Sequence, residues 1–312
     1  MRLIEPVTLP SQAATISPTF LCVGGGKGGV GKTLLSVNLS VEIARRGYRV
    51  LLVDADLSCS NVETVLGVQS NMRLDDFFVG KGRKALEPFI CDTHYENLRI
   101  LPSSSGLIEV ANPRYQQKLA FIRELRQLDA EVIILDLDAG AHLNTLDFFL
   151  ITDTNGVLVI TPEKTSIDNA FKFVRASLFR KIERFYQSPE VALLLKRNES
   201  LRDFIDCVQH SDIFDHDTRA QICGEMLALA RSIRPRIVVN RARTPYEAQV
   251  ASNILSKFTR NHLLVEPEYL GFMYYDPCVP DAINRGTPFV VSHPKQAISE
   301  CVNDIATRLG YV

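Results

Sequence analysis

A glycine-rich segment between a predicted strand and a predicted helix constrains the fold of this chain more than any other feature. Residues Gly26–Thr33 match the phosphate-loop pattern G-x-x-x-x-G-K-[ST]. The apolar run Phe20–Val23 before it predicts a buried strand, and the amphipathic residues Leu34–Arg46 after it predict a helix. Because strand and helix lie where such a loop needs them, the segment indicates an α/β protein rather than a glycine-rich turn with a chance Lys-Thr pair.

The residue types of this loop suit the binding of a polyphosphate. Glycines let the backbone approach a ligand closely, and consecutive N–H groups then form a concave anion site. The N-terminus of the following helix adds a partial positive charge. Lys32 would place an ammonium group on the β- and γ-phosphates, and the Thr33 hydroxyl would bind Mg²⁺. The loop therefore predicts a nucleoside-triphosphate site.

Charge and hydropathy argue against two other classes of protein. The 312 residues include 35 basic and 36 acidic side chains, so a strongly basic, nucleic-acid-binding surface is not expected. No run of about 18 apolar residues predicts a transmembrane helix. Glu5, Pro6 and Pro10 interrupt any signal-peptide core, so the chain is expected in the cytoplasm.

The cysteines favour neither a disulfide framework nor a metal cluster. There are seven, and no two form a C-x-x-C pair. Structural zinc and iron–sulfur sites use paired cysteines, so we expect no iron–sulfur cluster. The thiols are expected to be reduced, mostly as small buried hydrophobes.

Apolar and amphipathic segments alternate along the chain. Further strands are predicted at Val50–Val53, Leu98–Pro102, Val132–Asp136, Gly156–Thr161, Arg236–Asn240 and Tyr269–Phe272. Helices are predicted at Leu74–Phe78, Tyr115–Leu128, Ile167–Tyr186 (capped by Thr165 or Ser166), Tyr246–Arg260 and Pro294–Leu309. The fold class is therefore α/β, a doubly wound and mainly parallel sheet with helices on both faces. Residues 1–18 are expected to be extended or mobile, and 19–312 to form a single domain.

Two predicted strands end in carboxylates. Asp54 and Asp56 follow the strand at Val50–Val53, and Asp136 closes a later one. Doubly wound sheets place their chemistry at the carboxyl ends of parallel strands, so these groups are expected beside the phosphate loop. Asp136 would hold the Mg²⁺ shell through water. The residues Asp138–Gly140 are expected to form a mobile switch.

The connection at residues 187–233 is far longer than the usual αβ loop of about 2–6 residues. Its helical patterns at Val191–Lys196, Leu201–Val208 and Thr218–Ser232 predict two or three extra helices, on the edge of the sheet or as a small subdomain. Such an insertion is either a tolerated surface feature or a device that binds a partner. The sequence leaves both readings open.

Lys27 is a second lysine inside the glycine run, where an ordinary phosphate loop needs none. With it, GKGGVGKT resembles the deviant phosphate loop of the MinD/ParA class of ATPases; a solvated surface lysine is the alternative. Segments that resemble the FlhG/FleN flagellar regulators of this class are VLLVDADLSCSNVETVLGV (50–68), ILPSSSG (100–106), IILDLDAG (133–140), TPEKTSIDNAF (161–171), VVNRARTPYEAQ (238–249) and YLGFMYYDPCVPDAI (269–283).

The resemblance implies an ATPase whose two subunits enclose ATP between them. Lys27 would then reach the partner subunit's ATP in trans, and Lys27, Lys32 and Asp56 would be the catalytic residues. Asp56 would orient the attacking water. The implied magnesium site consists of Thr33, Asp54, Asp56 and Asp136, with a structural strand-end cap as the alternative for Asp54.

Further nucleotide contacts are implied by the same resemblance. The implied set is Gly26, Lys27, Gly28, Gly29, Val30, Gly31, Lys32, Thr33, Leu34, Glu163 and Asn240. Asn240 would contact adenine and Glu163 the partner's ribose, whereas an ordinary strand-end turn residue is the alternative for Asn240.

The resemblance has two gaps. Neither an Asp-Gln-Ala motif in Met1–Pro18 nor a cationic amphipathic helix in Pro294–Val312 is evident. It therefore does not extend to stimulation of a GTPase or to direct membrane association.

The function expected from these features is an ATP-dependent dimerisation switch with slow hydrolysis. It would recruit or place an unidentified protein partner, with flagellar number or position as the family role and recruitment to a cell pole or membrane by that partner. The alternative is a ParA-type partitioning ATPase that binds nonspecific DNA, which the net charge of −1 does not favour. An iron–sulfur carrier and a small-molecule kinase are weaker alternatives, since neither paired cysteines nor a second substrate motif is evident.

Overall fold

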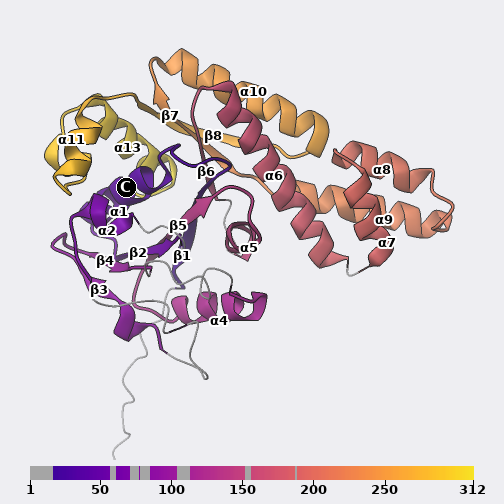
Figure 1. Ribbon diagram of the computed structural model, residues 1–312, viewed down its shortest axis with the longest axis horizontal. Coiled ribbons are helices and arrows are strands. Elements are labelled where there is room, and N and C mark those ends of the chain that lie inside the picture. Colours follow the sequence, from indigo (N-terminus) through magenta and orange to yellow (C-terminus); the bar gives the residue numbers. More distant parts are fainter. Residues whose placement is uncertain are drawn as a thin grey trace, which may run out of the picture.

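The computed structural model describes residues 17–56, 61–70, 77, 85–103, 113–151, 156–186 and 188–312. Within them, one sheet has the strand order β3-β4-β2-β5-β1-β6-β7-β8 (Figure 1). Its strands are β1 Thr19–Gly25, β2 Val50–Ala55, β3 Cys91–Asp92, β4 Leu98–Leu101, β5 Val132–Ala139, β6 Val157–Ile160, β7 Arg236–Ala242 and β8 Glu268–Tyr274.

Helices connect most of these strands. Those before β7 are α1 Lys32–Arg45, α2 Val62–Leu66, the 3-10 turn η1 Glu87–Phe89, α4 Tyr115–Leu125, α5 Leu143–Ile151, α6 Lys164–Phe185, α7 Pro189–Arg197, α8 Leu201–Gln209 and α9 His216–Arg231. Those after β7 are α10 Pro245–Leu263, α11 Cys278–Asn284, α12 Phe289–Ser292 and α13 Ala297–Arg308. No helix among the described residues is long and apolar enough to cross a membrane.

The sheet is parallel except at one edge, where β3 runs antiparallel to β4. The central strand β1 has β5 on one side and β6 on the other. The chain leaves β1 toward β2 on the β5 side and later returns to β6, so the winding direction reverses at β1. Ligands of open α/β sheets bind at such a point, outside the carboxyl ends of the strands. The predicted fold class is confirmed.

Both faces of the sheet are buried, which explains the continuous apolar runs in the sequence. In β1, Phe20 and Cys22 face one buried cluster, and Leu21 and Val23 face the other. Helices α1 and α13 cover the second face, whereas α4, α5, α6 and α10 cover the first (Figure 1). The phosphate loop therefore follows a central strand whose two faces are both covered by helices.

Three helices, α7, α8 and α9, fill the long connection between α6 and β7. They pack on α6 and α10 rather than on the edge of the sheet, and they project away from it in Figure 1. Their buried side chains, among them Phe204 and Met226, belong to the same apolar cluster as the α6 face. The insertion thus extends an existing core.

Several predicted boundaries differ from the structure by two or three residues, and two of them affect the site. β5 continues past Asp136 to Ala139. Helix α6 begins at Lys164, with Glu163 at the N-cap position, because the Ser166 hydroxyl accepts a hydrogen bond from the Thr161 N–H, 2.9 Å away, instead of capping the helix.

Several elements were not predicted. Strand β3 and helices α2, α11 and α12 are short, and α5 is apolar on nearly every side, so none carries a clear helical or strand period. The predictions for residues 1–16, for 104–106 and for the helix at 74–78, apart from residue 77, fall outside the described residues.

Candidate nucleotide-binding site

The phosphate loop joins β1 to α1 and depends on glycine at particular positions. Gly29 and Gly31 have φ angles of +75° and +96°, which other residues rarely adopt. A Cβ atom on Gly31 would lie 2.1 Å from Asn240 Nδ2, and one on Gly26 would lie 2.0 Å from the carbonyl oxygen of Asn169 on α6. Gly31 is also the N-cap of α1 and brings no side chain that would cover the first N–H groups of that helix.

Asn240 fastens the loop from the end of β7. Its Nδ2 donates to the carbonyl oxygen of Val30 at 2.8 Å, and its Oδ1 accepts from the Arg241 N–H at 2.8 Å. The side chain is buried, yet it contributes to the wall of the pocket. The structure thus gives Asn240 a role in holding the loop, while its contact with adenine stays a prediction.

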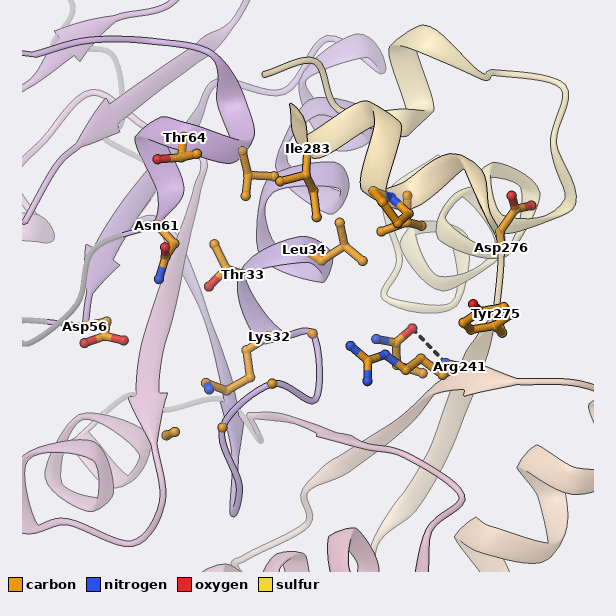
Figure 2. Close-up of a pocket in the computed structure, with 18 of the residues that line it drawn as sticks. Lys32, Thr33, Leu34, Asp56, Asn61, Thr64, Arg241, Tyr275, Asp276 and Ile283 are labelled. Atoms are coloured by element: carbon orange, nitrogen blue, oxygen red, sulfur yellow. Dashed lines mark hydrogen bonds between the residues drawn. The ribbon is translucent and has the colours of Figure 1, made fainter. Parts of the chain in front are cut away.

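A pocket of about 590 Å³ opens above the loop. Figure 2 shows Lys32, Thr33 and Asp56 at one end of it and Arg241, Tyr275 and Asp276 at the other. Leu34 and Ile283 lie between the two ends. One end is suited to phosphates, and the apolar middle and aromatic end are suited to a sugar and a flat base.

The three predicted carboxylates differ in their access to this pocket. Asp54 and Asp136 are adjacent across β2 and β5 and are almost wholly buried. Asp54 Oδ1 accepts the Asp56 N–H at 3.1 Å, and Asp136 Oδ1 accepts the Ser36 hydroxyl at 2.9 Å. Among the described carboxylates of this set, only Asp56 lines the pocket. Asp56 can therefore contact a ligand directly, whereas Asp54 and Asp136 are buried behind the pocket wall.

Burial raises the pKa of Asp136 to about 6, and the charge of Asp56 adds to the rise. Hydrogen bonds with the side chains of Thr33 and Ser36, and the charge of Lys32, lower the pKa and offset part of the effect. A cation bound beside these oxygens would stabilise the ionised form. Hydroxyl and carboxylate oxygens are ligands that Mg²⁺ prefers, so the residues present fit a magnesium ion.

Lys27 lies apart from the pocket of its own subunit. Its ammonium group donates to the Thr165 hydroxyl on α6 at 3.4 Å, and the side chain is exposed. Lys27 is not among the described residues that line the pocket. The other lysine of the loop, Lys32, is 8% exposed and lines it.

Glu163 is also exposed, beside Lys27 at the start of α6. A hydrogen bond with Thr161 lowers the pKa of Glu163 most, and the charges of Arg241 and Lys27 lower it further. The two residues predicted to act across a dimer therefore lie close together on the surface rather than in the pocket.

Sequence reasoning missed part of the pocket. It also missed Ser36, which is buried behind the pocket and donates to Asp136; Ser36 lies one turn after Lys32 on α1, and this spacing could have revealed it. The walls from α2 and α11 meet at Gly67 and Gly286, where a Cβ on Gly67 would lie 1.9 Å from the Gly286 carbonyl oxygen. Other missed lining residues are Asn61, Thr64, Tyr275 and Asp276. They carry no local motif, because only the folded chain brings them together.

Known proteins resemble this chain in sequence and in fold. The antiactivator FleN of Pseudomonas aeruginosa is 26% identical over 300 residues, which cover 96% of this chain and 89% of FleN. The flagellum site-determining protein YlxH of Helicobacter pylori is 28% identical over 184 residues, which cover 55% of this chain and 58% of YlxH. The predicted resemblance to flagellar regulators of the MinD/ParA class is confirmed.

Among solved structures, the septum site-determining protein MinD of Pyrococcus horikoshii, complexed with Mg-ADP, matches with a TM-score of 0.64. The match covers 94% of this chain and 96% of MinD at 22% identity, so it shows that the two proteins share a fold. A family model, the CobQ/CobB/MinD/ParA nucleotide binding domain, matches residues 21–289. This chain therefore belongs to the CobQ/CobB/MinD/ParA family of nucleotide-binding proteins.

Proposed function

We propose that this protein is an ATPase that switches between a monomer and an ATP-bound dimer and thereby controls the recruitment or placement of a protein partner. The observation that carries the proposal is the position of Lys27. A lysine within the phosphate loop that extends away from its own pocket toward Thr165 is free to enter the pocket of a second subunit. Dimerisation would then be favoured by ATP, because the triphosphate binds better to the state with both lysines.

The residues of the pocket divide the chemical work. Lys32 and the first N–H groups of α1 bind the phosphates. Asp56, on the pocket wall, positions the attacking water, while Asp136, which accepts the Ser36 hydroxyl, orients the Thr33 hydroxyl. Thr33, Asp54, Asp56 and Asp136 would hold Mg²⁺, directly or through water, and the ion would supply positive charge against the phosphates.

Two surface residues would complete the site across the dimer. Lys27 would enter the partner's pocket and stabilise charge on the phosphates, as an arginine finger does. Glu163 would accept a hydrogen bond from the partner's ribose. Within each subunit, Asn240 and Leu34 would contact the base and sugar.

The cellular role would concern the number or position of flagella. YlxH, which resembles this chain, is named as a flagellum site-determining protein, and FleN as an antiactivator. The protein would act in the cytoplasm and reach a cell pole or membrane through its partner.

Mixing two inactive variants tests whether Lys27 acts in trans. Lys27→Ala keeps Asp56, and Asp56→Ala keeps Lys27, so only a mixed dimer has one site with both groups. Phosphate release should be lost in each variant alone and restored in the mixture. Unchanged turnover of Lys27→Ala alone, or no recovery on mixing variants that both bind ATP, would contradict the proposal.

A further inference from the structure

A second cavity, of about 650 Å³, lies between α6, α10 and the segment that joins α7 to α8. We call it the α6–α10 groove. Its apolar wall consists of Ile167 and Phe171 from α6 and Ile254 and Phe258 from α10. It shares no lining residue with the nucleotide pocket, and the function proposed above makes no use of it.

Aromatic side chains form one end of the groove. The ring centroids of Phe171 and Phe258 are 6.2 Å apart, and His262 lies 6.0 Å from Phe171 and 6.1 Å from Phe258. The Phe258 and His262 rings are stacked, with 16° between their planes. These contacts hold the rings in place, so an incoming apolar group would meet a preformed surface and lose little side-chain entropy.

The apolar surface continues beyond the groove along α10. Tyr246, Val250, Ile254 and Phe258 are 78%, 37%, 40% and 49% exposed and lie four residues apart. Residues at this spacing form one ridge on a helix, and twelve residues span about 18 Å, or three turns. Isolated exposed hydrophobes are ordinary, whereas a ridge leading into an apolar groove is typical of a protein-binding surface.

The edge of the groove is acidic. Asp168, Glu199 and Asp203 contribute three carboxylates to the lining, against the single ammonium group of Lys164. Within the described part of the chain, Glu199 and Asp203 take part in no salt bridge, while Asp168 pairs with Lys172 at 2.7 Å on the open surface. The Lys172 ammonium therefore cancels most of the charge of Asp168 at a distance, and Glu199 and Asp203 are left as the carboxylates of the edge that attract cations.

We propose that the α6–α10 groove binds an amphipathic helix of a partner protein, with large apolar side chains on one face and lysine or arginine on the flanks. A helix matches the three-turn ridge and the single apolar channel. Its basic flanks complement the carboxylates of Glu199 and Asp203, which favour a basic partner over an acidic one. Glu199 and Asp203 belong to the insertion at residues 187–233, so the insertion would take part in binding the partner.

The groove is next to the surface that carries Lys27. Lys164 lines the groove, and the neighbouring Thr165 accepts the hydrogen bond from Lys27. The loop itself packs on α6 at Gly26. The proposal nevertheless rests only on the groove and stands whether or not ATP drives dimerisation.

Fluorescence anisotropy with two synthetic peptides tests this inference on the full chain. Both are helical 18-residue peptides with leucine and phenylalanine at the spacing i, i+3, i+4, i+7. One has lysine and arginine on its flanks, and the other has glutamate at the same positions. The protein variants are Phe258→Ala in the groove and Leu193→Ala on α7, a matched control whose side chain is 51% exposed and outside the lining.

The basic peptide should bind, and Phe258→Ala should weaken it by about tenfold or more, as loss of an aromatic anchor does. Leu193→Ala should change the affinity by less than about twofold, and the acidic peptide should bind far more weakly. ATP binding should be the same in Phe258→Ala as in the parent, which separates a failure of the groove from a failure of the nucleotide site.

Three results would overturn the inference. One is equal affinity of the basic peptide for Phe258→Ala and for the parent. Another is no binding at about 1 mM peptide, where even a weak interface would register. The third is self-association of the free parent that Phe258→Ala abolishes, because a second copy of this chain would then occupy the groove.

Discussion

The nucleotide pocket and the α6–α10 groove enclose similar volumes, about 590 and 650 Å³, but they are built in opposite ways. At its phosphate end the pocket is formed by the backbone of the loop and by charged groups such as Lys32 and Asp56, and the loop is held by the hydrogen bond from Asn240 Nδ2 to the Val30 oxygen. The groove is formed by side chains, with Phe171 and Phe258 at its aromatic end. A triphosphate needs fixed N–H groups and charge, whereas a partner helix needs apolar area.

The comparison also separates the two lysines of the loop. Lys32 lies in the pocket and is nearly buried, whereas Lys27 extends along α6 toward the groove side of the molecule. The same short motif therefore supplies one group to its own site and one to the surface. The predictions below test whether pocket and groove are independent, beginning with the largest expected effect.

Removal of Lys32 should affect the pocket alone. Lys32→Ala leaves the phosphates without their nearly buried ammonium partner and should weaken ATP binding by about 4 kcal/mol, near 1,000-fold. Binding of the basic peptide to the groove should not change. Calorimetry with ATP and anisotropy with the peptide measure both, and a parallel loss of the two would mean that the regions are not independent.

The buried acid of the pocket should make stability depend on pH. Because the folded protein holds the pKa of Asp136 at about 6, above the ordinary 3.8, the folded state binds the extra proton between these values. The free energy of unfolding should therefore fall by about 3 kcal/mol as pH rises from about 4 to above 6.

Without nucleotide or magnesium, Asp136→Asn should remove this component. Denaturant unfolding at several pH values should show the variant gaining stability relative to the parent as pH rises. Asp168→Asn, at the exposed edge of the groove, is the control for replacing a carboxylate away from the pocket. A constant difference between Asp136→Asn and the parent across this range would contradict the raised pKa.

The close backbone contact at the pocket wall should tolerate no side chain. Gly67→Ala places a Cβ at φ +71° and 1.9 Å from the Gly286 oxygen, which should cost about 2 kcal/mol of stability. Gly47→Ala has a similar φ, +92°, with nothing within 4 Å, and should cost about 1 kcal/mol. Thermal unfolding compares the two, and equal losses would show that the contact with Gly286 adds nothing.

Nucleotide affinity should also fall in Gly67→Ala alone, since α2 would have to move away from α11 at the wall of the pocket.

The smallest effect concerns the acidic edge of the groove. Glu199→Gln and Asp203→Asn should each weaken the basic peptide by about 0.5 kcal/mol, or roughly twofold, because both carboxylates are exposed and screened. The salt dependence of peptide binding should become shallower in the double variant. An undiminished salt dependence would place the basic flanks of the helix elsewhere.

Features formed by contiguous residues could be predicted from the sequence. The strand, loop and helix around Gly26–Thr33 are contiguous, and their motif has fixed spacing, so the fold class and the core of the pocket were predictable. The three insertion helices were also visible, because each has its own apolar period and α7, α8 and α9 begin with the capping residues Ser188, Ser200 and Asp215.

The remainder depends on contacts between distant segments. The groove combines residues from 162 to 262 at no fixed spacing, and the exposed ridge on α10 looks like an ordinary amphipathic helix until its neighbours are placed. The predicted start of α6 is wrong because serine is a common N-cap residue, whereas the Ser166 hydroxyl accepts a hydrogen bond from the Thr161 N–H instead. Hydrogen-bonding capacity is evident from the sequence, but the choice of partner is set by packing.

The solution mass of Asp56→Ala, measured by light scattering with and without Mg-ATP, tests most directly whether ATP assembles a dimer completed by Lys27. Without hydrolysis, a 34.9 kDa monomer should double its mass only when Mg-ATP is present. The same measurement on Asp56→Ala combined with Lys27→Ala should show a monomer that still binds ATP. A mass that does not change while ATP is demonstrably bound, or a dimer that survives the loss of Lys27, would contradict the proposed switch.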